Sequence, residues 1–169
     1  MAKPLPARSI LPFIAVLLLA FGCGEEHVVF EENVEIPDAK WATSEKAILT
    51  TEIDDTLSQN NFLINVRNTE AYPYRNLYLF VKTVFPNGKS SNDTVGIILA
   101  DKSGRWLGKG SGYLNSGSYA TNSVMYQYNK RFPLKGEYRF EIEQAMRVDT
   151  LVGIKNIGLR IERNPGAGR

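Results

Sequence analysis

The chain has 169 residues, 43% of them hydrophobic and 11% aromatic, so it is long and apolar enough for one globular domain and is not a disordered chain. Its formal net charge of +2, from 20 basic and 18 acidic side chains, gives no reason to expect a nucleic-acid partner. The single Cys and single His exclude an internal disulfide, a Cys-based zinc site and any site that needs two imidazoles.

Residues 1–22 have the pattern of an export signal. Two basic side chains precede an apolar run from Ile10 to Phe21, and Gly22 stands directly before the only cysteine, Cys23. At about 1.5 Å per residue this run is too short to cross about 30 Å of hydrocarbon as a helix. We therefore predict that the signal is removed and that the mature chain begins at Cys23.

The four residues Ala20-Phe21-Gly22-Cys23 resemble a bacterial lipobox, although Ala stands where Leu is usual. In that motif the thiol becomes thioether-linked to diacylglycerol, and acyl chains such as palmitate hold the protein on a membrane. We predict lipidation of Cys23. A soluble exported protein with a free thiol and an uncut anchor are the alternatives.

Residues 23–45 read as a lipidated, acidic tether. Residues 24–55 hold ten acidic and two basic side chains, whereas residues 56–169 hold eight acidic and sixteen basic ones. Either the acidic segment is a solvated leader, or it is attracted to the basic remainder, or the domain faces an anionic surface.

Residues 46–163 are predicted to form an antiparallel two-sheet β-sandwich of about eight strands, jelly-roll-like, with a closed barrel as the alternative. Short alternating apolar runs, separated by Pro, Gly and Asn turns, carry this prediction. The expected strands are 28–31, 47–53, 62–67, 77–82, 94–100, 124–132, 138–143 and 157–162. Only residues 143–151 could form a short helical turn, and residues 164–169 are expected to fray.

The run 77–82 is apolar on both of its faces. Leu77, Leu79 and Val81 alternate with Tyr78 and Phe80. Strands that are apolar on both faces lie inside a sheet, so we predict a central strand here.

The sequence offers little material for catalysis, and we expect no enzyme activity, no cofactor and no metal. His27 lies four residues after the predicted lipid attachment, and an acylated cysteine cannot act as a nucleophile. Glu141 and Glu143 share one strand face, which suits a hydrolase, but a polar ladder with Arg139 explains them better.

The segment 104–112 is rich in glycine, yet it fails the phosphate-loop pattern. Only three residues separate Gly104 from Gly108, and Lys109 is followed by Gly rather than Ser or Thr. We interpret this segment as an irregular connection or edge strand, in which Trp106 could be an exposed aromatic for a partner or a sugar.

Three Asp-Thr-aliphatic triplets resemble the acceptor of bacterial O-glycosylation. They begin at Asp55, Asp93 and Asp149. The same triplets also suit turns that enter strands. The predicted acceptors are Thr56, Thr94 and Thr150.

Several segments in one order resemble the GldH family of gliding-motility lipoproteins, from Cys23 to about Arg163. The segments are Tyr72-Pro73-Tyr74, Asn76-Leu77-Tyr78, Phe85-Pro86-Asn87-Gly88, Asp93-Thr94, Leu99-Ala100-Asp101, Gly104-Arg105-Trp106-Leu107-Gly108-Lys109-Gly110, Arg131-Phe132-Pro133, Gln144-Ala145-Met146-Arg147 and Gly158-Leu159-Arg160.

This resemblance implies a membrane-anchored envelope lipoprotein without enzyme activity. It also implies a role in gliding, with other motility lipoproteins and the linked secretion machinery as partners. Gly24 after the cysteine resembles lipoproteins released to the outer membrane, whereas Glu25-Glu26 resembles surface-export signals, so orientation stays open.

We interpret the protein as a non-catalytic scaffold that contacts partners through aromatic, Met and Arg side chains near turns. The candidate contacts are Tyr72, Tyr74, Arg105, Trp106, Lys109, Met146 and Arg147. Packing at a strand corner is the preferred alternative for Tyr72 and Tyr74.

The competing hypothesis is an envelope glycan-binding module. It would present Trp106 together with the tyrosines at 113, 119, 126 and 128, although core packing explains these tyrosines equally well.

Overall fold

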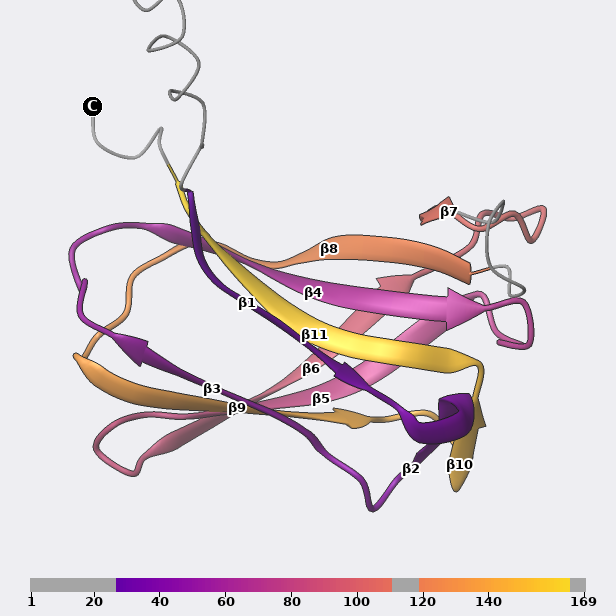
Figure 1. The fold of residues 1–169 in the computed structure, drawn as a ribbon, viewed down its shortest axis with the longest axis horizontal. Coiled ribbons are helices and arrows are strands. Elements are labelled where there is room, and N and C mark those ends of the chain that lie inside the picture. The colour runs from indigo at the N-terminus through magenta and orange to yellow at the C-terminus, as the bar shows by residue number, and fades with distance from the viewer. Residues whose placement is uncertain (1–26, 111–118, 165–169) are drawn as a thin grey trace, which may run out of the picture.

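A computed structural model describes residues 27–110 and 119–164, and these form two antiparallel β-sheets packed face to face, with a small third sheet at one end (Figure 1). The five-stranded sheet has the order β1 (Val28–Glu35), β11 (Ile154–Arg163), β4 (Asn60–Thr69), β8 (Tyr119–Lys130) and β7 (Lys109–Gly110). The four-stranded sheet has the order β3 (Ala47–Ile53), β9 (Gly136–Gln144), β5 (Asn76–Val84) and β6 (Ser90–Ile98). A 3₁₀ turn, η1 (Pro37–Ala39), precedes the two-stranded sheet of β2 (Lys40–Ala42) and β10 (Thr150–Val152).

The eight long strands pair in a nested way. The first, β1, pairs with the last, β11, and inside this pair β3 pairs with β9, β4 with β8 and β5 with β6. A long hairpin that rolls up in this manner is a jelly roll, so the predicted fold class is confirmed. No ladder joins the two large sheets within the described residues, and the structure is therefore a sandwich rather than a closed barrel.

The core lies between the two sheets and follows the period-two alternation of the strands. Leu49, Ile64, Leu79, Ile142 and Leu159 have no exposed surface. Burial of each such side chain contributes about 1.5–3 kcal/mol, so this layer is the main source of stability. Aromatic rings close one end of the core, where Phe62 contacts Phe132, Phe132 contacts Tyr138 edge-on, and Tyr138 stacks on Phe140.

The expected tether proves to belong to the sandwich as far back as Val28. Strand β1 pairs with β11 over Val28–Glu35, and β2 pairs with β10. The sequence predicts a strand only over residues 28–31, and the structure extends it to Glu35: Phe30 and Val34 face the core, while Glu31 forms an ion pair with Arg160 at 2.6 Å. One acidic side chain of β1 thus contacts the basic remainder of the chain, whereas Glu32 and Glu35 are exposed to solvent.

The expected helical turn over residues 143–151 is wrong. The Gln144 side chain is buried, its amide donates to the Val148 carbonyl at 2.9 Å, and its oxygen accepts the Met146 N–H at 2.9 Å. These bonds satisfy the backbone in a bend, and the chain then enters β10. A helix over these residues would break both hydrogen bonds of the buried Gln144 side chain.

The two described ends of the chain lie together at one end of the sandwich (Figure 1). The Arg163 N–H donates to the His27 carbonyl at 2.6 Å, and the Asn164 N–H donates to the Gln59 carbonyl at 2.7 Å. The signal 1–22, Cys23 and residues 165–169 of the expected tail lie outside the described residues. Across the part that the structure describes, no helix has the length and apolar character needed to span a bilayer.

A candidate docking groove on the four-stranded sheet

A groove of about 500 Å³ runs over the outer face of the four-stranded sheet, away from the core. Its walls come from β5, β6 and the bend that follows β9. The lining residues are Tyr74, Asn76, Tyr78, Phe80, Thr94, Ala145, Met146, Arg147 and Val148. The sequence-predicted contacts Tyr74, Met146 and Arg147 therefore meet at one place, and we name this surface the docking groove.

Strand β5 supplies the aromatic floor of the docking groove. As predicted, it is a central strand, with β9 on one side and β6 on the other. Its inward residues Leu77 and Leu79 are completely buried, but Tyr78 is 48% exposed and Phe80 is 52% exposed. The second apolar face of this strand is thus presented to solvent rather than to a further layer of protein.

Gly96 on β6 leaves room for the Tyr78 ring. The two residues are register partners, and a Cβ at position 96 would lie 2.9 Å from the Cε1 atom of Tyr78. The ring therefore lies across the neighbouring strand, where any larger residue would displace it. This close approach keeps the floor of the groove shallow and open at the edge strand β6.

The bend after β9 forms the opposite wall and is fixed to β5. The Ala145 N–H donates to the Tyr78 carbonyl at 2.8 Å, and the Tyr78 N–H donates to the Met146 sulfur at 3.4 Å. Met146 also packs against the core, whereas Arg147 is exposed at the rim. No ion pair to Arg147 occurs among residues 27–110 and 119–164, so the rim carries one positive charge.

Tyr72 packs at the strand corner and is only 3% exposed, so it cannot present a surface here. Its hydroxyl donates to the Asn76 carbonyl at 2.7 Å, and its ring contacts Tyr74 at 5.8 Å and Trp106 at 6.2 Å between centroids. Burial, together with the neighbouring Tyr74, raises the pKa of the Tyr72 phenol. Tyr72 supports the position of Tyr74, which is half-buried and lines the docking groove.

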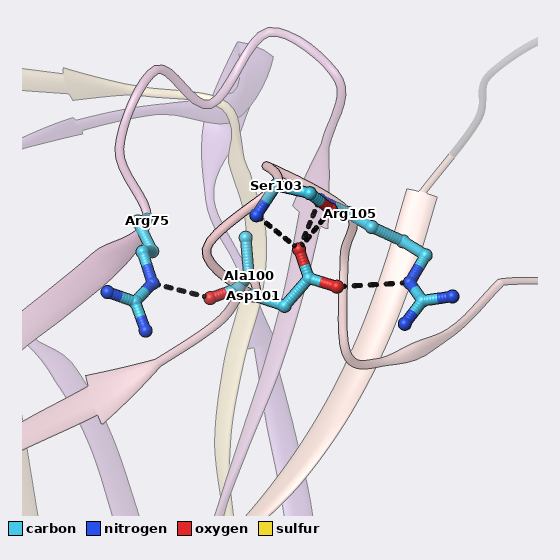
Figure 2. A network of polar contacts seen from close by, with 5 residues as sticks. All are labelled: Arg75, Ala100, Asp101, Ser103 and Arg105. Atoms are coloured by element: carbon cyan, nitrogen blue, oxygen red, sulfur yellow. Dashed lines mark hydrogen bonds and ion pairs between the residues drawn. The ribbon is translucent and has the colours of Figure 1, made fainter.

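Arg105 lies in a loop that Asp101 organises (Figure 2), and Trp106 follows it in the chain. One Asp101 oxygen accepts the Ser103 hydroxyl and backbone N–H at 2.6 and 2.9 Å, and the other accepts the Arg105 Nε at 3.1 Å. The bonds from Ser103, then those from Arg105, lower the pKa of Asp101 to about 2. Trp106 is half-buried against Tyr72, and the side chain of Lys109, on β7, lies outside what the structure describes.

Glu141 and Glu143 form a charged ladder with Lys46 and Arg139. Lys46 lies 3.3 Å from Glu141 and 2.6 Å from Glu143, and Arg139 lies 3.3 Å from Glu141. Hydrogen bonds to Glu143 and then Glu141 raise the pKa of Lys46. Glu141 is buried in this network, which the solvated ladder did not anticipate. The described ranges contain no cluster of three or more His, Cys, Asp and Glu side chains that could hold a metal ion.

The predicted glycosylation threonines occupy three different settings. Thr94 is exposed on β6 and lines the docking groove, and Thr150 is exposed at the start of β10. Thr56 is half-buried in a turn where Asp55 accepts backbone N–H groups at 2.9 and 3.0 Å. Modification of these threonines stays a prediction.

The aromatic side chains proposed for glycan binding do not gather into a platform in the described part of the chain. Tyr126 donates its hydroxyl to Asp93 on the opposite sheet, Tyr128 is 65% exposed, and Trp106 packs on Tyr72. Tyr113 and the Tyr119 side chain lie outside the described residues. The docking groove instead draws on Tyr78 and Phe80, which the sequence reasoning placed inside the sheet. The apolar alternation on both faces of residues 77–82 was the signal that could have identified them.

Comparisons with known proteins agree with one another. The model of the GldH lipoprotein family matches residues 28–161. A gliding motility lipoprotein GldH homolog of Christiangramia forsetii is 30% identical over 167 residues, which cover 94% of this chain and 97% of that protein. The gliding motility lipoprotein GldH of Flavobacterium johnsoniae is 30% identical over 162 residues, which cover 92% of this chain and 95% of that protein.

Proposed function

Because the chain belongs to the GldH lipoprotein family, we propose that it is a non-catalytic envelope scaffold for gliding motility that holds a partner protein in the docking groove. The observation that carries this proposal is the half-exposed aromatic floor of Tyr78 and Phe80 beside Met146 and Arg147. Aromatic, Met and Arg side chains are enriched where proteins bind one another. Other motility lipoproteins and the linked secretion machinery are the partners that the family suggests.

The anchor of this scaffold is a lipid on Cys23. Cys23 precedes His27 by four residues, which reach at most about 14 Å, so the lipid would hold the terminal end of the sandwich close to the membrane. The docking groove includes Asn76 and Tyr78, at the beginning of β5, while β5 runs toward the anchored end. The groove would therefore lie toward the end of the sandwich that is away from the bilayer, and Gly24 favours the outer membrane as its location.

The chemistry of the groove specifies the partner segment. Its floor is apolar, its rim carries Arg147, and β6 is an edge strand that pairs only with β5 in the described chain. We expect an extended segment with alternating apolar side chains and a carboxylate for Arg147. Such a segment could also pair with the open edge of β6, because edge strands accept an added strand.

Complementation of a deletion strain tests this proposal. The deletion is expected to abolish gliding and to lower the levels of partner lipoproteins, and the parent chain is expected to restore both. Tyr78→Glu should fail to restore them, although its protein level should match that of the parent. The matched control is Ile48→Glu, since Ile48 is 44% exposed on the same sheet but outside the groove. Equal rescue by both variants would refute the docking groove, and an unmodified Cys23 in mass spectra of the mature terminus would refute the anchor.

A further inference from the structure

A second hollow, of about 490 Å³, lies on the outer face of the other sheet, over β1, β11, β4 and β8. The docking groove has an aromatic floor, whereas this hollow is lined by amide, hydroxyl and charged side chains. The lining residues are Glu31, Asn33, Leu63, Asn65, Arg67, Thr121, Ser123, Asn156, Arg160 and Glu162. We name it the polar hollow.

One row of register partners crosses the sheet beneath the polar hollow. Asn33 pairs with Gly158, Gly158 with Asn65, and Asn65 with Ser123. A Cβ at position 158 would lie 2.3 Å from the Asn33 side-chain oxygen, so glycine is what lets the amide lie across β11. The Asn33 side chain therefore covers Gly158, and longer side chains in the adjacent rows form the walls.

The walls of the polar hollow are already ordered. The Asn65 amide, only 9% exposed, donates to Glu31 at 3.0 Å and accepts the Ser123 hydroxyl at 2.7 Å. Glu31 in turn binds Arg160 at 2.6 Å, and Arg160 also binds Glu162. Groups that are fixed before binding lose little entropy when a ligand arrives, so this arrangement favours recognition.

One lining group lacks a partner. The side-chain oxygen of Asn156 is buried and accepts no hydrogen bond in the structure. Buried acceptors without a donor are costly, so a donor brought by water or by a ligand would stabilise this atom. Asn156 lies beside Arg67 in the register, so an incoming hydroxyl would find an acceptor next to a cationic donor.

We propose that the polar hollow binds a neutral saccharide. A sugar hydroxyl both donates and accepts, and the lining offers both functions: carboxylates and the Asn156 oxygen accept, while the arginines and the amide groups donate. The lining holds two acidic and two basic side chains, so its charge favours a neutral ligand over a phosphate or a cation. Leu63 supplies a small apolar contact for the C–H face of a sugar ring.

A peptide fits the polar hollow less well. The hollow lies on the face of the sheet, over β1, β11, β4 and β8, so a strand added at the edge of β1 would extend the sheet sideways and would not fill the hollow. The described lining contains no aromatic side chain and no apolar pocket for an anchor residue. The volume of the hollow is nevertheless within the range of small-molecule sites.

Titration of the purified full-length lipoprotein tests this proposal. The detergent should be a polyoxyethylene ether, which has no sugar headgroup to compete. The probes are maltohexaose, cellohexaose, laminarihexaose, mannohexaose and xylohexaose, with hexagalacturonate and a Gly-Ser decapeptide as acidic and peptide comparisons. We expect at least one neutral hexasaccharide to bind and to shift the side-chain amide NMR signals of Asn33, Asn65 and Asn156. Binding by the peptide alone or by hexagalacturonate alone, or by no hexasaccharide, would overturn the proposal.

Asn156→Leu separates a ligand role from a structural one. It removes the unpartnered oxygen, so the fold should be unchanged or more stable, while saccharide affinity should fall about tenfold, the value of one lost hydrogen bond. Asn92→Leu, the same change at an exposed position on β6, should leave binding intact. Thr121→Val, at an exposed lining position, is a second variant that should weaken binding without affecting the fold. Unchanged affinity in both lining variants would overturn the proposal.

Discussion

Replacing Phe80 by serine removes an aromatic side chain that the fold leaves 52% exposed. Complete burial of a Phe is worth about 1.5–3 kcal/mol, so losing the half that is buried should cost about 1 kcal/mol of unfolding free energy. The adjacent Leu79 has no exposed surface, because it points into the core from the same strand. Leu79→Ala should therefore cost about 2–5 kcal/mol. Comparison of the unfolding free energies of the two variants therefore shows which face of β5 is packed.

Urea unfolding, followed by the fluorescence of the buried Trp41, gives the two free energies directly. Partner capture by crosslinking in native envelopes gives the functional effect, and loss of a central aromatic contact should reduce it by about 30-fold, equivalent to about 2 kcal/mol. Leu79→Ala should reduce capture only as far as it reduces the amount of folded protein. If Phe80→Ser destabilises the protein as much as Leu79→Ala, the aromatic floor is a packed layer and the docking groove is wrong.

Three further variants probe the fold around the groove. Gly153→Ala should lower the unfolding free energy by about 2–4 kcal/mol in a urea titration, because φ is +89° and the new Cβ would lie 2.4 Å from the Tyr72 nitrogen. Tyr126→Phe should cost about 1–2 kcal/mol by the same titration, since its hydroxyl joins β8 to Asp93 on the other sheet; no change would show that this bond is not formed. Asp101 has its pKa lowered to about 2, so its stabilisation is complete above pH 4 and is lost as the pH falls toward 2. Asp101→Asn should accordingly flatten the acid limb of a pH–stability profile, and an unaltered limb would contradict this assignment.

The fold could be predicted from the sequence because its strands alternate strictly. Residues 138–143 and 157–162 became the central parts of β9 and β11. Strand β1 was assigned to the tether beyond residue 31, because its carboxylates dominate the composition. Arg160, which pairs with Glu31, lies 129 positions away along the chain, and composition does not reveal such a contact.

The docking groove was only half predictable. Residue type suggested Tyr74, Met146 and Arg147 as contacts. The exposure of Phe80 depends on whether another layer of protein covers this face of the sheet, and the sequence of one strand does not reveal whether such a layer exists. The polar hollow was not predictable, because Asn33, Gly158, Asn65 and Ser123 come together only through the register of four strands. Likewise, the bend at Gln144 depends on a buried amide rather than on local propensity.

Photocrosslinking in the living envelope tests the central claim most directly. A photoreactive amino acid in place of Phe80 samples the docking groove, and the same group in place of Ile48 samples the exposed face of the same sheet outside it. We predict a discrete crosslink to an envelope lipoprotein or secretion component from position 80 that is lost when Tyr78→Glu is added, and none from position 48. Equal crosslinking from the two positions, or none from position 80, would contradict the account.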